Sequence, residues 1–336
     1  MIGRTLVTGG TGSLGRAITR QRIRESDDVV VVFSRSEYAQ AQFHESLVAD
    51  VGLATVEKKA RWCLGDVRDP DRLRMAMRGV DTVIHAAALK RVDAVAQHPD
   101  EVVKTNIVGT VNVIRAAMDS GVQRVLVISS DKAVLPTTSY GTSKQMSEWI
   151  AVGMNTYTVP AGTAVAAIRY GNVLGSRGSV VHIWREAIRQ NRNLPLTKTG
   201  NTRFIITMDQ ALQQIRFALD NMQGGEIFVP KLPWCYVEVI GQAMSPRAYF
   251  DLVGLRPGGE KEHEQLLSDE ERHRCAETAG AYVVVPHIKT WHTEDYWTPQ
   301  VPALIPAYVS GSGQRPTITP RELEPLIAAV PEGGLF

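Results

Sequence analysis

Short runs of apolar and β-branched residues alternate with longer segments of helical pattern through the first half of the chain. Because the runs are short and are bounded by Gly, Asp and Ser, they are typical of strands. They predict strands at residues 4–8, 29–34, 60–64, 81–86, 124–130 and 163–169. The segments between them predict helices at residues 13–25, 36–49, 70–78 and 100–119. This alternation predicts a parallel sheet with helices on both faces. The unbroken run VVVVF is expected inside that sheet, where both faces of a strand are buried.

After residue 170 the alternation becomes less regular. Helices are expected at 181–190 and 208–222, and the apolar run 226–230 is expected to return to the sheet. The sequence therefore predicts an α/β chain, with a Rossmann-like, doubly wound parallel sheet and a smaller C-terminal substrate-binding region. The expected boundaries are residues 1–170 for the Rossmann domain, with 204–230 returning to it, and 171–203 and 231–336 for the substrate-binding region and C-terminal extension.

The composition limits the partners and the compartment. The 336 residues carry a formal net charge of +2, and the charged residues are mixed along the chain. No long-range field results, so we expect neither a nucleic-acid partner nor a membrane partner. Cys63, Cys235 and Cys275 are not spaced as metal ligands, so we expect no disulfides, no metal site and a reducing, cytoplasmic location. The chain begins with a strand pattern and has no window of 18 apolar residues, so no signal peptide or membrane span is expected.

A glycine-rich stretch, TGGTGSLG, joins the first expected strand to the first expected helix. In this context G-x-G-x-x-G is a dinucleotide fingerprint, and the same stretch also fits the G-x-x-G-x-x-G spacing of short-chain dehydrogenases. Glycine lets the backbone approach a pyrophosphate, and the helix N-terminus supplies N–H donors. A glycine-rich turn without a ligand is the plainer interpretation. The expected cofactor contacts in this stretch are Gly9, Thr11, Gly12, Ser13, Leu14 and Gly15.

The second expected strand ends in FSRSE, where NAD sites usually carry an acid for the ribose hydroxyls. Ser34, Arg35 and Ser36 offer donors and a cation instead. This set suits a 2′-phosphate, so the sequence predicts NADP as the cofactor. Glu37 is near enough to keep NAD as an alternative, and Arg35 as a solvated surface residue is the plainer interpretation.

Two further strand ends complete the expected cofactor site. Asp66 in GDVRD, with Val67 beside it, is expected to accept a hydrogen bond from the adenine amino group, and its alternative role is to cap the helix near Pro70. The small residues of HAAALK let the backbone approach the cofactor, and Lys90 is expected to face the cofactor and the substrate. The contacts expected from HAAALK are Ala86, Ala87, Ala88 and Lys90.

Tyr140 and Lys144 form a Tyr-x-x-x-Lys pair in SYGTSK. On a helix, residues four apart project from the same face. A neighbouring ammonium favours the phenolate, so we expect Lys144 to lower the pKa of Tyr140 and to make it a usable base. Ser130, at the end of the fifth expected strand, is expected to hydrogen-bond the hydroxyl that is oxidised. The pair is also expected to contact the cofactor.

Asp131 and Lys132 follow the same strand end, where sites on open parallel sheets collect. A helix cap and a surface lysine are the plainer interpretation of these two residues. A simple oxidation, however, needs only one proton carrier. An acid that protonates a departing hydroxyl, together with a base that removes a proton from carbon, would convert oxidation into elimination.

Taken together, the motifs resemble those of extended short-chain dehydrogenase/reductases that act as UDP-N-acetylglucosamine 4,6-dehydratases. The similarity is greatest to the inverting type that opens pseudaminic-acid pathways, within the polysaccharide biosynthesis proteins. It extends from about residue 4 to the mid-260s. The motifs that carry it are TGGTGSLG, FSR, GDVRD, HAAALK, KTNIVGT, SSDKAVLPTTSYGTSK, RYGNVLGSRGSVV, TRFIIT, GGEIFVPK and GLRPGGEKEHE.

The resemblance implies roles for the proton carriers. Tyr140 would deprotonate the 4-hydroxyl of the sugar while hydride passes from carbon 4 to NADP. Lys132 would then remove the proton from carbon 5, Asp131 would protonate the leaving 6-hydroxyl, and the hydride would return to carbon 6. The cofactor would end the cycle as it began.

The resemblance also implies a UDP-sugar as the partner and a set of residues that bind it. The family's R-P-G-E-K appears here as RPGGEKE, one residue longer, so this loop is expected to sit differently. Each of these residues could instead belong to the loop structure. The expected substrate contacts are Lys90, Asn172, Ser176, Arg177, Ser179, Arg203, Arg256 and Glu260.

Two other functions remain open at the level of sequence. A nucleotide-sugar epimerase or reductase would share Tyr140 and Lys144 but would not need Asp131 and Lys132. A non-catalytic NADP-sensing regulator would not need the Tyr/Lys pair. Family members often form dimers or higher oligomers, so a homo-oligomer is expected. Residues 286–320, dense in Pro, Trp and Tyr, are expected to wrap the surface or to contact another subunit.

Overall fold

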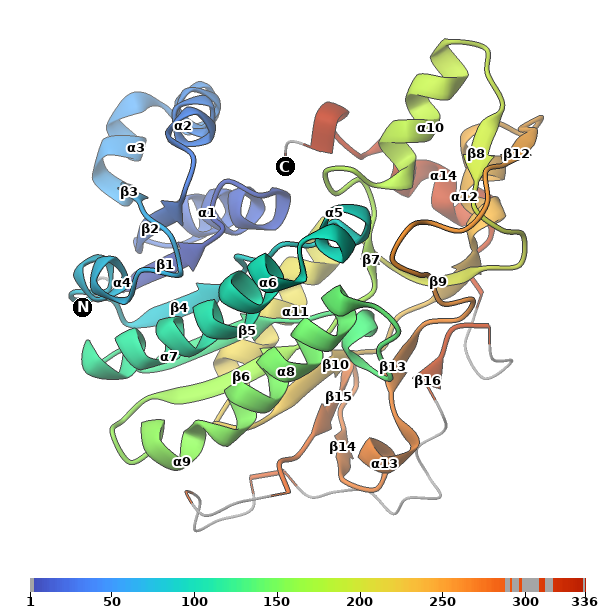
Figure 1. The fold of residues 1–336 in the computed structure, drawn as a ribbon. Helices are drawn as coiled ribbons and strands as arrows, with labels where there is room; N and C mark the ends of the chain where they lie inside the picture. Colours follow the sequence, from blue (N-terminus) through green and yellow to red (C-terminus); the bar gives the residue numbers. More distant parts are fainter. Residues whose placement is uncertain (1–2, 288–290, 292–295, 298–307, 312–316, 335) are drawn as a thin grey trace.

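The computed structural model describes residues 3–287, 291, 296–297, 308–311, 317–334 and 336, and a nine-stranded sheet forms the centre of this part of the chain (Figure 1). Seven strands run parallel in the order β3-β2-β1-β4-β5-β6-β10, and the antiparallel hairpin β14-β15 extends the sheet beyond β10. This is the strand order of a doubly wound dinucleotide-binding sheet. The bounds of the nine strands are β1 (Arg4–Thr8), β2 (Val29–Ser34), β3 (Ala60–Leu64), β4 (Thr82–His85), β5 (Arg124–Ile128), β6 (Ala164–Ile168), β10 (Ile227–Pro230), β14 (Cys275–Glu277) and β15 (Ala281–Val284).

Helices cover the sheet in two layers, as the alternation predicts. In Figure 1, α7 and α8 lie in front of the sheet and α11 lies behind it. α4 contacts α7 on the first face, and α1 contacts α11, α2 and α3 on the other. The predicted α/β class and parallel sheet are therefore confirmed. The bounds are α1 (Ser13–Glu25), α2 (Glu37–Val51), α3 (Leu53–Lys59), α4 (Pro70–Ala76), α5 (Val92–Gln97), α6 (Pro99–Val102), η1 (Val103–Val108), α7 (Gly109–Asp119), η2 (Asp131–Ala133), α8 (Ser139–Gly153), α9 (Asn155–Thr158) and α11 (Met208–Asn221).

The helix predicted at 100–119 is not a continuous α-helix. It consists of α6, a π-helical segment η1, and α7. A π-helical turn adds a residue to the turn and often occurs near a functional site. Here it contains Asn106, whose side-chain oxygen accepts from the Leu89 N–H at 2.8 Å and whose amide donates to Ser143 Oγ at 2.9 Å. Asn106 therefore connects the loop after β4 to α8.

A smaller lobe packs beside the carboxyl ends of the parallel strands. Its buried core includes Val181, Trp184, Leu194 and Leu323, and it is separate from the core of the main sheet. The lobe carries the predicted helix at 181–190 as α10. Its elements are β7 (Asn172–Val173), α10 (Val180–Arg189), β8 (Leu194–Leu196), β9 (Thr202–Ile206), β11 (Trp234–Tyr236), α12 (Val237–Met244), β12 (Phe250–Leu252), α14 (Pro320–Ala328) and η4 (Glu332–Gly334). The remaining elements are β13 (Gln265–Leu267), α13 (Asp269–Arg272) and β16 (Tyr308–Val309), and the buried side chains of β13 and β16 belong to the core of the main sheet.

Two features of the second half concern the expected domain boundaries. β9, at the start of the segment 204–230 expected to return to the sheet, pairs with β7 and β11 instead, and the return begins with α11 and β10. The hairpin β14-β15 belongs to the main sheet, although its residues fall within the expected C-terminal extension. The division of the chain into the two expected domains stays a prediction. Most of the stretch 286–320, with its expected surface or subunit contact, lies outside the described residues.

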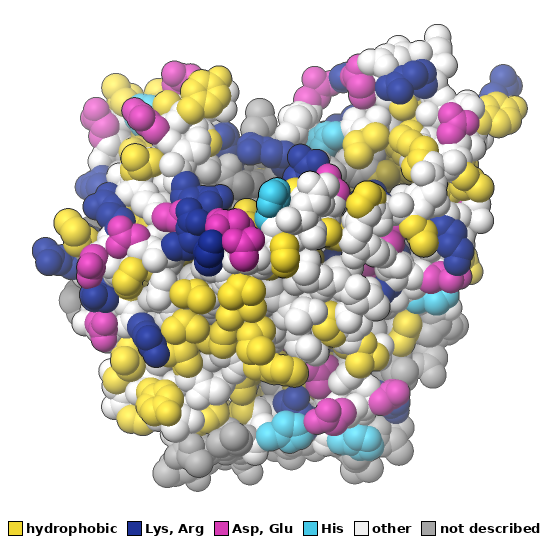
Figure 2. Space-filling view, in the orientation of Figure 1, with side chains coloured by type: hydrophobic (Ala, Val, Ile, Leu, Met, Phe, Trp, Pro, Cys, Tyr) yellow, Lys and Arg dark blue, Asp and Glu magenta, His cyan; other side chains and the backbone are white. Residues whose placement is uncertain are grey.

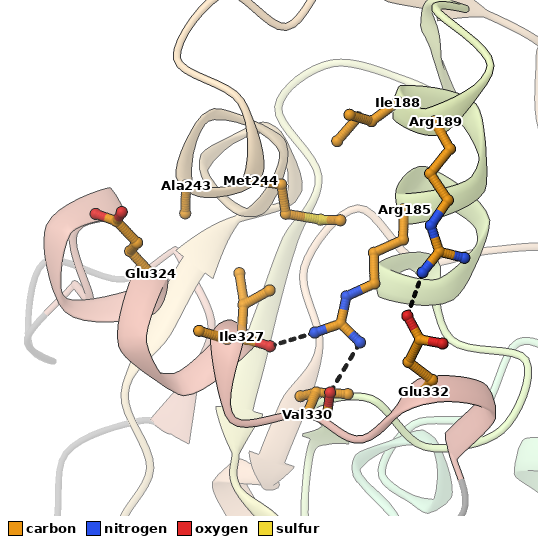
Figure 3. Close-up of a pocket in the computed structure, with 10 residues that line it drawn as sticks. Arg185, Ile188, Arg189, Ala243, Met244, Glu324, Ile327, Val330 and Glu332 are labelled. Atoms are coloured by element: carbon orange, nitrogen blue, oxygen red, sulfur yellow. Dashed lines mark hydrogen bonds and ion pairs between the residues drawn. The ribbon is translucent and has the colours of Figure 1, made fainter.

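A hollow between α10, α12 and α14 lies within the smaller lobe (Figure 3). Arg185 points across it and donates to the carbonyls of Ile327 and Val330 at 2.5 and 2.8 Å, while Arg189 pairs with Glu332. Arg185 therefore attaches α10 to the C-terminal end of α14. None of the helices that the structure describes has the length and apolarity to cross a membrane.

A buried ion network joins α8 to α13. Arg169, at the end of β6, is 3% exposed and donates to both oxygens of Glu148 at 2.9 and 2.6 Å and to both oxygens of Glu271 at 2.6 and 2.9 Å. Ser129 Oγ also donates to Glu148 Oε1 at 2.5 Å. Burial opposes ionisation of Glu271, but Arg169 outweighs it and lowers the pKa of Glu271 to about 2.

We expect Arg169→Ala to destabilise the fold by about 3–5 kcal/mol at neutral pH, because it leaves two buried carboxylates without their cation. The pKa of Glu271 is lowered on folding, so its contribution is complete above the unfolded pKa of about 4.3 and is lost as the pH falls toward 2. Urea unfolding at several pH values measures the difference. Arg189→Ala, which removes an exposed pair, should cost at most about 1 kcal/mol. Equal costs for the two variants would contradict the network.

Candidate active site

The glycine-rich turn lies between β1 and α1, as its position in the sequence predicts. Gly9 has a φ of +67°, and a Cβ added to Gly15 would lie 2.6 Å from Gly10 Cα. Gly12 is the N-cap of α1 and, because it has no side chain, it offers the first-turn N–H groups no side-chain acceptor. These features fit the pyrophosphate of a dinucleotide, which the backbone of this turn and the N-terminus of α1 would hold.

Three cations gather beside this turn. The Arg177 N–H donates to Ser13 Oγ at 3.0 Å. Burial lowers the pKa of Arg16 to about 10, with Arg177 as the next cause. Lys90 is exposed, yet the protein atoms around its ammonium lower its pKa and the charge of Arg177 lowers it further. Mutual repulsion of this kind would be relieved by a bound anion. The sequence predicted Lys90 and Arg177 here, but it gave no sign of Arg16.

The end of β2 carries Ser34, Arg35 and Ser36. Ser34 is buried and accepts from the Gln40 amide at 3.1 Å, and Ser36 caps α2 by accepting from the Ala39 N–H at 3.1 Å. Arg35 is exposed and lies 3.7 Å from Asp66. Arg35 is therefore the exposed cation at this strand end.

Asp66 is surrounded by cations. Its carboxylate accepts from the Arg68 N–H at 2.9 Å and from the Arg68 guanidinium at 2.7 Å. Burial opposes ionisation, but Arg68 outweighs it and lowers the pKa of Asp66. The alternative role of Asp66 as a helix cap is wrong, because Asp69 caps α4 by accepting from the Arg72 N–H at 2.9 Å.

The other expected cofactor contacts line the neighbouring strand ends. Ala86, Ala87 and Ala88 are half-buried, and the Ala87 N–H donates to Thr8 Oγ1 at 3.2 Å. A Cβ added to Gly9 would lie 2.9 Å from Ala87 Cα, so glycine is required at position 9, where the two strand ends meet. The remaining contacts pack close by: the Thr11 carbonyl accepts from Arg16, Leu14 packs on the main core, and Val67 is buried.

Asp131 and Lys132 form a contact at the end of β5. Ser130 caps the short helix η2, and its hydroxyl donates to Asp131 Oδ1 at 2.6 Å. Lys132 Nζ donates to the same oxygen at 3.1 Å. Asp131 is 0% exposed, and its Oδ2 has no hydrogen-bond partner among the described residues. The plainer interpretation, a cap and a surface lysine, is therefore wrong, because Ser130 is the cap and Lys132 pairs with a buried acid.

A second carboxylate approaches Lys132 from the loop before β13. Glu264 Oε1 lies 3.1 Å from Lys132 Nζ, and Glu264 Oε2 lies 3.6 Å from Lys261 Nζ. Burial alone would lower the pKa of Lys132, but Asp131 and Glu264 outweigh it and raise that pKa. Burial raises the pKa of Asp131, with Lys132 opposing and Glu264 adding to the rise. Burial also opposes ionisation of Glu264, but Lys132, Arg203 and Lys261 lower its pKa.

Tyr140 and Lys144 lie on α8, with Ser130, Asp131 and Lys132 in the electrostatic surroundings of the Tyr140 hydroxyl. The expected lowering of the Tyr140 pKa by Lys144 is wrong for this arrangement. Burial raises the pKa of Tyr140 to about 12, and the cation that opposes the rise is Lys132. Lys144 Nζ instead donates to the Ile128 carbonyl at 2.8 Å, and burial lowers its pKa to about 8 against the opposing charge of Glu148.

The expected substrate residues fall into three groups. Ser176 and Arg177 lie over the glycine-rich turn, and Ser179 caps α10 with its hydroxyl buried and without a hydrogen-bond partner in the described part of the chain. Arg203 and Glu260 pair in the interior, near Lys132. Asn172 and Arg256 are exposed, in β7 and in the loop after β12.

Comparison with known proteins agrees with this geometry. The family model described as "Polysaccharide biosynthesis protein" matches residues 5–286. An inverting UDP-N-acetylglucosamine 4,6-dehydratase of Campylobacter jejuni is 37% identical over 286 residues, which cover 84% of this chain and 83% of that protein. A UDP-glucose 4-epimerase of Rickettsia bellii is 36% identical over 289 residues, covering 84% and 82%.

Two solved structures have the same fold. Pen from Bacillus thuringiensis is 31% identical with a TM-score of 0.86, and the match covers 97% of this chain and 98% of that one. The dTDP-glucose 4,6-dehydratase DesIV from Streptomyces venezuelae, solved with NAD bound, is 25% identical with a TM-score of 0.67, covering 76% and 86%. Dehydratases and an epimerase are therefore both among the similar proteins, and overall similarity does not separate them.

Proposed function

This chain belongs to the family of polysaccharide biosynthesis proteins, and we propose that it acts as a nucleotide-sugar 4,6-dehydratase. The observation that carries the proposal is the contact of buried Asp131 with Lys132 at 3.1 Å, next to Ser130 and Tyr140. Oxidation alone needs one proton carrier, whereas elimination of water needs an acid and a base as well. The name of the Campylobacter relative supports UDP-N-acetylglucosamine as the substrate and inversion at carbon 5.

Tyr140 takes the proton of the sugar 4-hydroxyl, and Ser130 hydrogen-bonds that hydroxyl. A bound NADP would supply the acceptor for the hydride of carbon 4 and the source of the hydride that carbon 6 receives. The ketone formed at carbon 4 acidifies the proton on carbon 5, which Lys132 removes. Asp131 protonates the leaving 6-hydroxyl, and its raised pKa favours the protonated form that this step requires.

The substrate diphosphate is held where cations and unsatisfied donors meet. Arg177 and Lys90 lie beside the glycine-rich turn, and the buried Ser179 hydroxyl is free to donate to a ligand within the part of the chain described. Arg203, paired with Glu260, contributes charge near Lys132. Charge-assisted hydrogen bonds to phosphate are the strong contacts of such sites.

A nucleotide-sugar epimerase is the second candidate, because the Rickettsia relative is almost as similar as the dehydratase. Mass spectrometry of the product separates the two. Incubation with UDP-N-acetylglucosamine should yield a nucleotide sugar that has lost one water, whereas a product of unchanged mass would favour the epimerase.

NADP is proposed as the preferred cofactor because Arg35 is the exposed cation at the end of β2. The protein should bind NADP more tightly than NAD in calorimetry. Arg35→Ala should narrow that difference by about 1.5–3 kcal/mol, the contribution of one charge-assisted contact. Arg74→Ala, which removes an exposed arginine of α4, should leave the difference in binding free energy between NADP and NAD unchanged. Equal affinities of the parent protein for the two cofactors would contradict the proposal.

A homo-oligomer is also proposed. Apolar side chains gather on the face of the molecule that Figure 2 shows. The exposed apolar residues of η1 and α8 are Val103, Val108, Met146 and Trp149. An apolar surface of this kind is typical of a contact between subunits. The cytoplasmic location stays a prediction.

A further inference from the structure

Four charged side chains form an alternating row beside β5. Lys132 Nζ lies 3.1 Å from Asp131 on one side and 3.1 Å from Glu264 on the other, and Lys261 follows at 3.6 Å from Glu264. Asp131 and Glu264 are 0% and 2% exposed. Lys132 is therefore a bridge between two buried carboxylates, only one of which has a role in the proposed function.

The row poses a chemical problem for Lys132. Held between two carboxylates, it carries an ammonium, and an ammonium removes a proton only if it gives one up. Among the residues that the structure describes, the two carboxylates within hydrogen-bond distance of Lys132 Nζ are Asp131 and Glu264. Asp131 must keep its own proton to protonate the leaving hydroxyl, so Glu264 is the acceptor that remains.

We propose, on the basis of the proposed function, that Glu264 is a positioning residue that takes the Lys132 proton as Lys132 removes the proton from carbon 5. The C5–H bond breaks and a new N–H bond forms on Lys132, while one of its former N–H protons forms an O–H bond on Glu264. Asp131 loses its proton to the 6-hydroxyl, which leaves as water. The Lys132 bridge then returns the proton from Glu264 to Asp131. As the hydride returns to carbon 6, carbon 5 takes up a proton, which balances the proton that Tyr140 gained from the 4-hydroxyl and now gives up, so the cycle closes without another reactant.

The surroundings of Glu264 support this role. The cations that face its carboxylate are Lys132, Lys261 and Arg203, and they favour the ionised form that can accept a proton. Asp131, in contrast, is buried beside Ser130 and Tyr140, and the negative charge of Glu264 favours its protonated form. The two carboxylates are thus driven toward opposite protonation states, which is how an acid and a base are set up in one site.

The loop that carries Glu264 is built to hold it in place. Gly258 and Gly259 have φ of +91° and +95°, so glycine is favoured at both positions of the longer RPGGEKE loop. Lys261 Nζ donates to the Val134 carbonyl at 2.5 Å, which attaches the loop to the segment after Lys132. The Glu264 N–H donates to Ser310 Oγ at 2.7 Å.

The test is Glu264→Gln, which keeps the shape of the side chain but cannot accept the proton. In a single turnover with UDP-N-acetylglucosamine, E264Q should reduce the bound cofactor as the parent does. Its yield of 4-keto-6-deoxy sugar and its deuterium uptake at carbon 5 in deuterated water should fall about 10²-fold or more. Glu264→Asp should restore part of the loss. Glu262→Gln, the same change at an exposed residue of the loop, should behave as the parent.

The outcomes separate the two proposals. A parent protein that makes no 4-keto-6-deoxy sugar would overturn the proposed function itself. An active parent with E264Q within threefold of it would overturn only the role of Glu264. If thermal unfolding shows that E264Q is not folded, the test rests on Glu264→Asp. A carbon 5 step that slows more than cofactor reduction supports the role of Glu264, and equal slowing of both steps overturns it.

Discussion

Lys132→Ala should release almost no 4-keto-6-deoxy product, although it should still bind the nucleotide sugar and pass hydride to the cofactor. Tyr140, which serves the first step, remains in place, whereas the ammonium that bridges Asp131 and Glu264 is gone. A general base typically contributes about 10²–10⁴-fold, so steady-state product formation should fall by that factor. Single-turnover absorbance should show reduced cofactor accumulating, because the later step no longer consumes it.

Loss of Lys132 also leaves two buried carboxylates close together without a cation between them. Thermal unfolding and nucleotide binding of the variant must therefore be measured along with its rates, to show that it is folded and binds substrate. Lys104→Ala, which removes an exposed lysine of η1, controls for the loss of a surface charge. A folded Lys132→Ala enzyme that turns over within a few-fold of the parent would show that this lysine takes no part in elimination.

Tyr140→Phe should stop both steps. The phenolate of Tyr140 is the group that accepts the 4-hydroxyl proton. Without it, hydride transfer and the elimination that depends on it should both slow by about 10²–10⁴-fold. The pKa of Tyr140 is raised to about 12 by burial, against the opposing charge of Lys132. Lys132→Ala should therefore raise that pKa further and shift the pH profile of the first step toward alkaline pH.

Tyr157, an exposed tyrosine of α9, provides the matched control. Tyr157→Phe should leave both steps unchanged. If Tyr140→Phe still accumulates reduced cofactor at the parent rate, the proton of the 4-hydroxyl must leave by another route, and the first step needs a different base.

The fold was predictable because its signals are local. The strands of the parallel sheet are short segments rich in apolar and β-branched residues, and the long helices between them are marked by length, so strands such as β1 and β2 match their predicted bounds. The sequence pattern did not predict the π-helical segment η1, in which Asn106 is hydrogen-bonded to the loop after β4 and to α8. The hairpin β14-β15 was missed because its membership in the main sheet depends on pairing with β10, far back in the chain.

The same distinction holds for the site. Ser130, Asp131, Lys132 and Tyr140 follow one strand end, so proximity in the sequence was enough to group them. Glu264 comes from a distant loop, and GGEKEHE contains three acids between which the sequence pattern does not choose. The pKa of Tyr140 was misjudged for a related reason, because burial and the direction of Lys144 depend on packing around α8. The roles of these residues in catalysis stay predictions.

The most direct measurement is incubation of the protein with NADP and UDP-N-acetylglucosamine in deuterated water, followed by NMR of the product. We expect a 4-keto-6-deoxy sugar that carries deuterium at carbon 5, with coupling constants of the inverted configuration. Deuterium at that carbon reports directly that its proton was removed and replaced. A sugar that keeps its 6-hydroxyl and carries no deuterium at carbon 5, altered only at carbon 4, would contradict it and identify an epimerase.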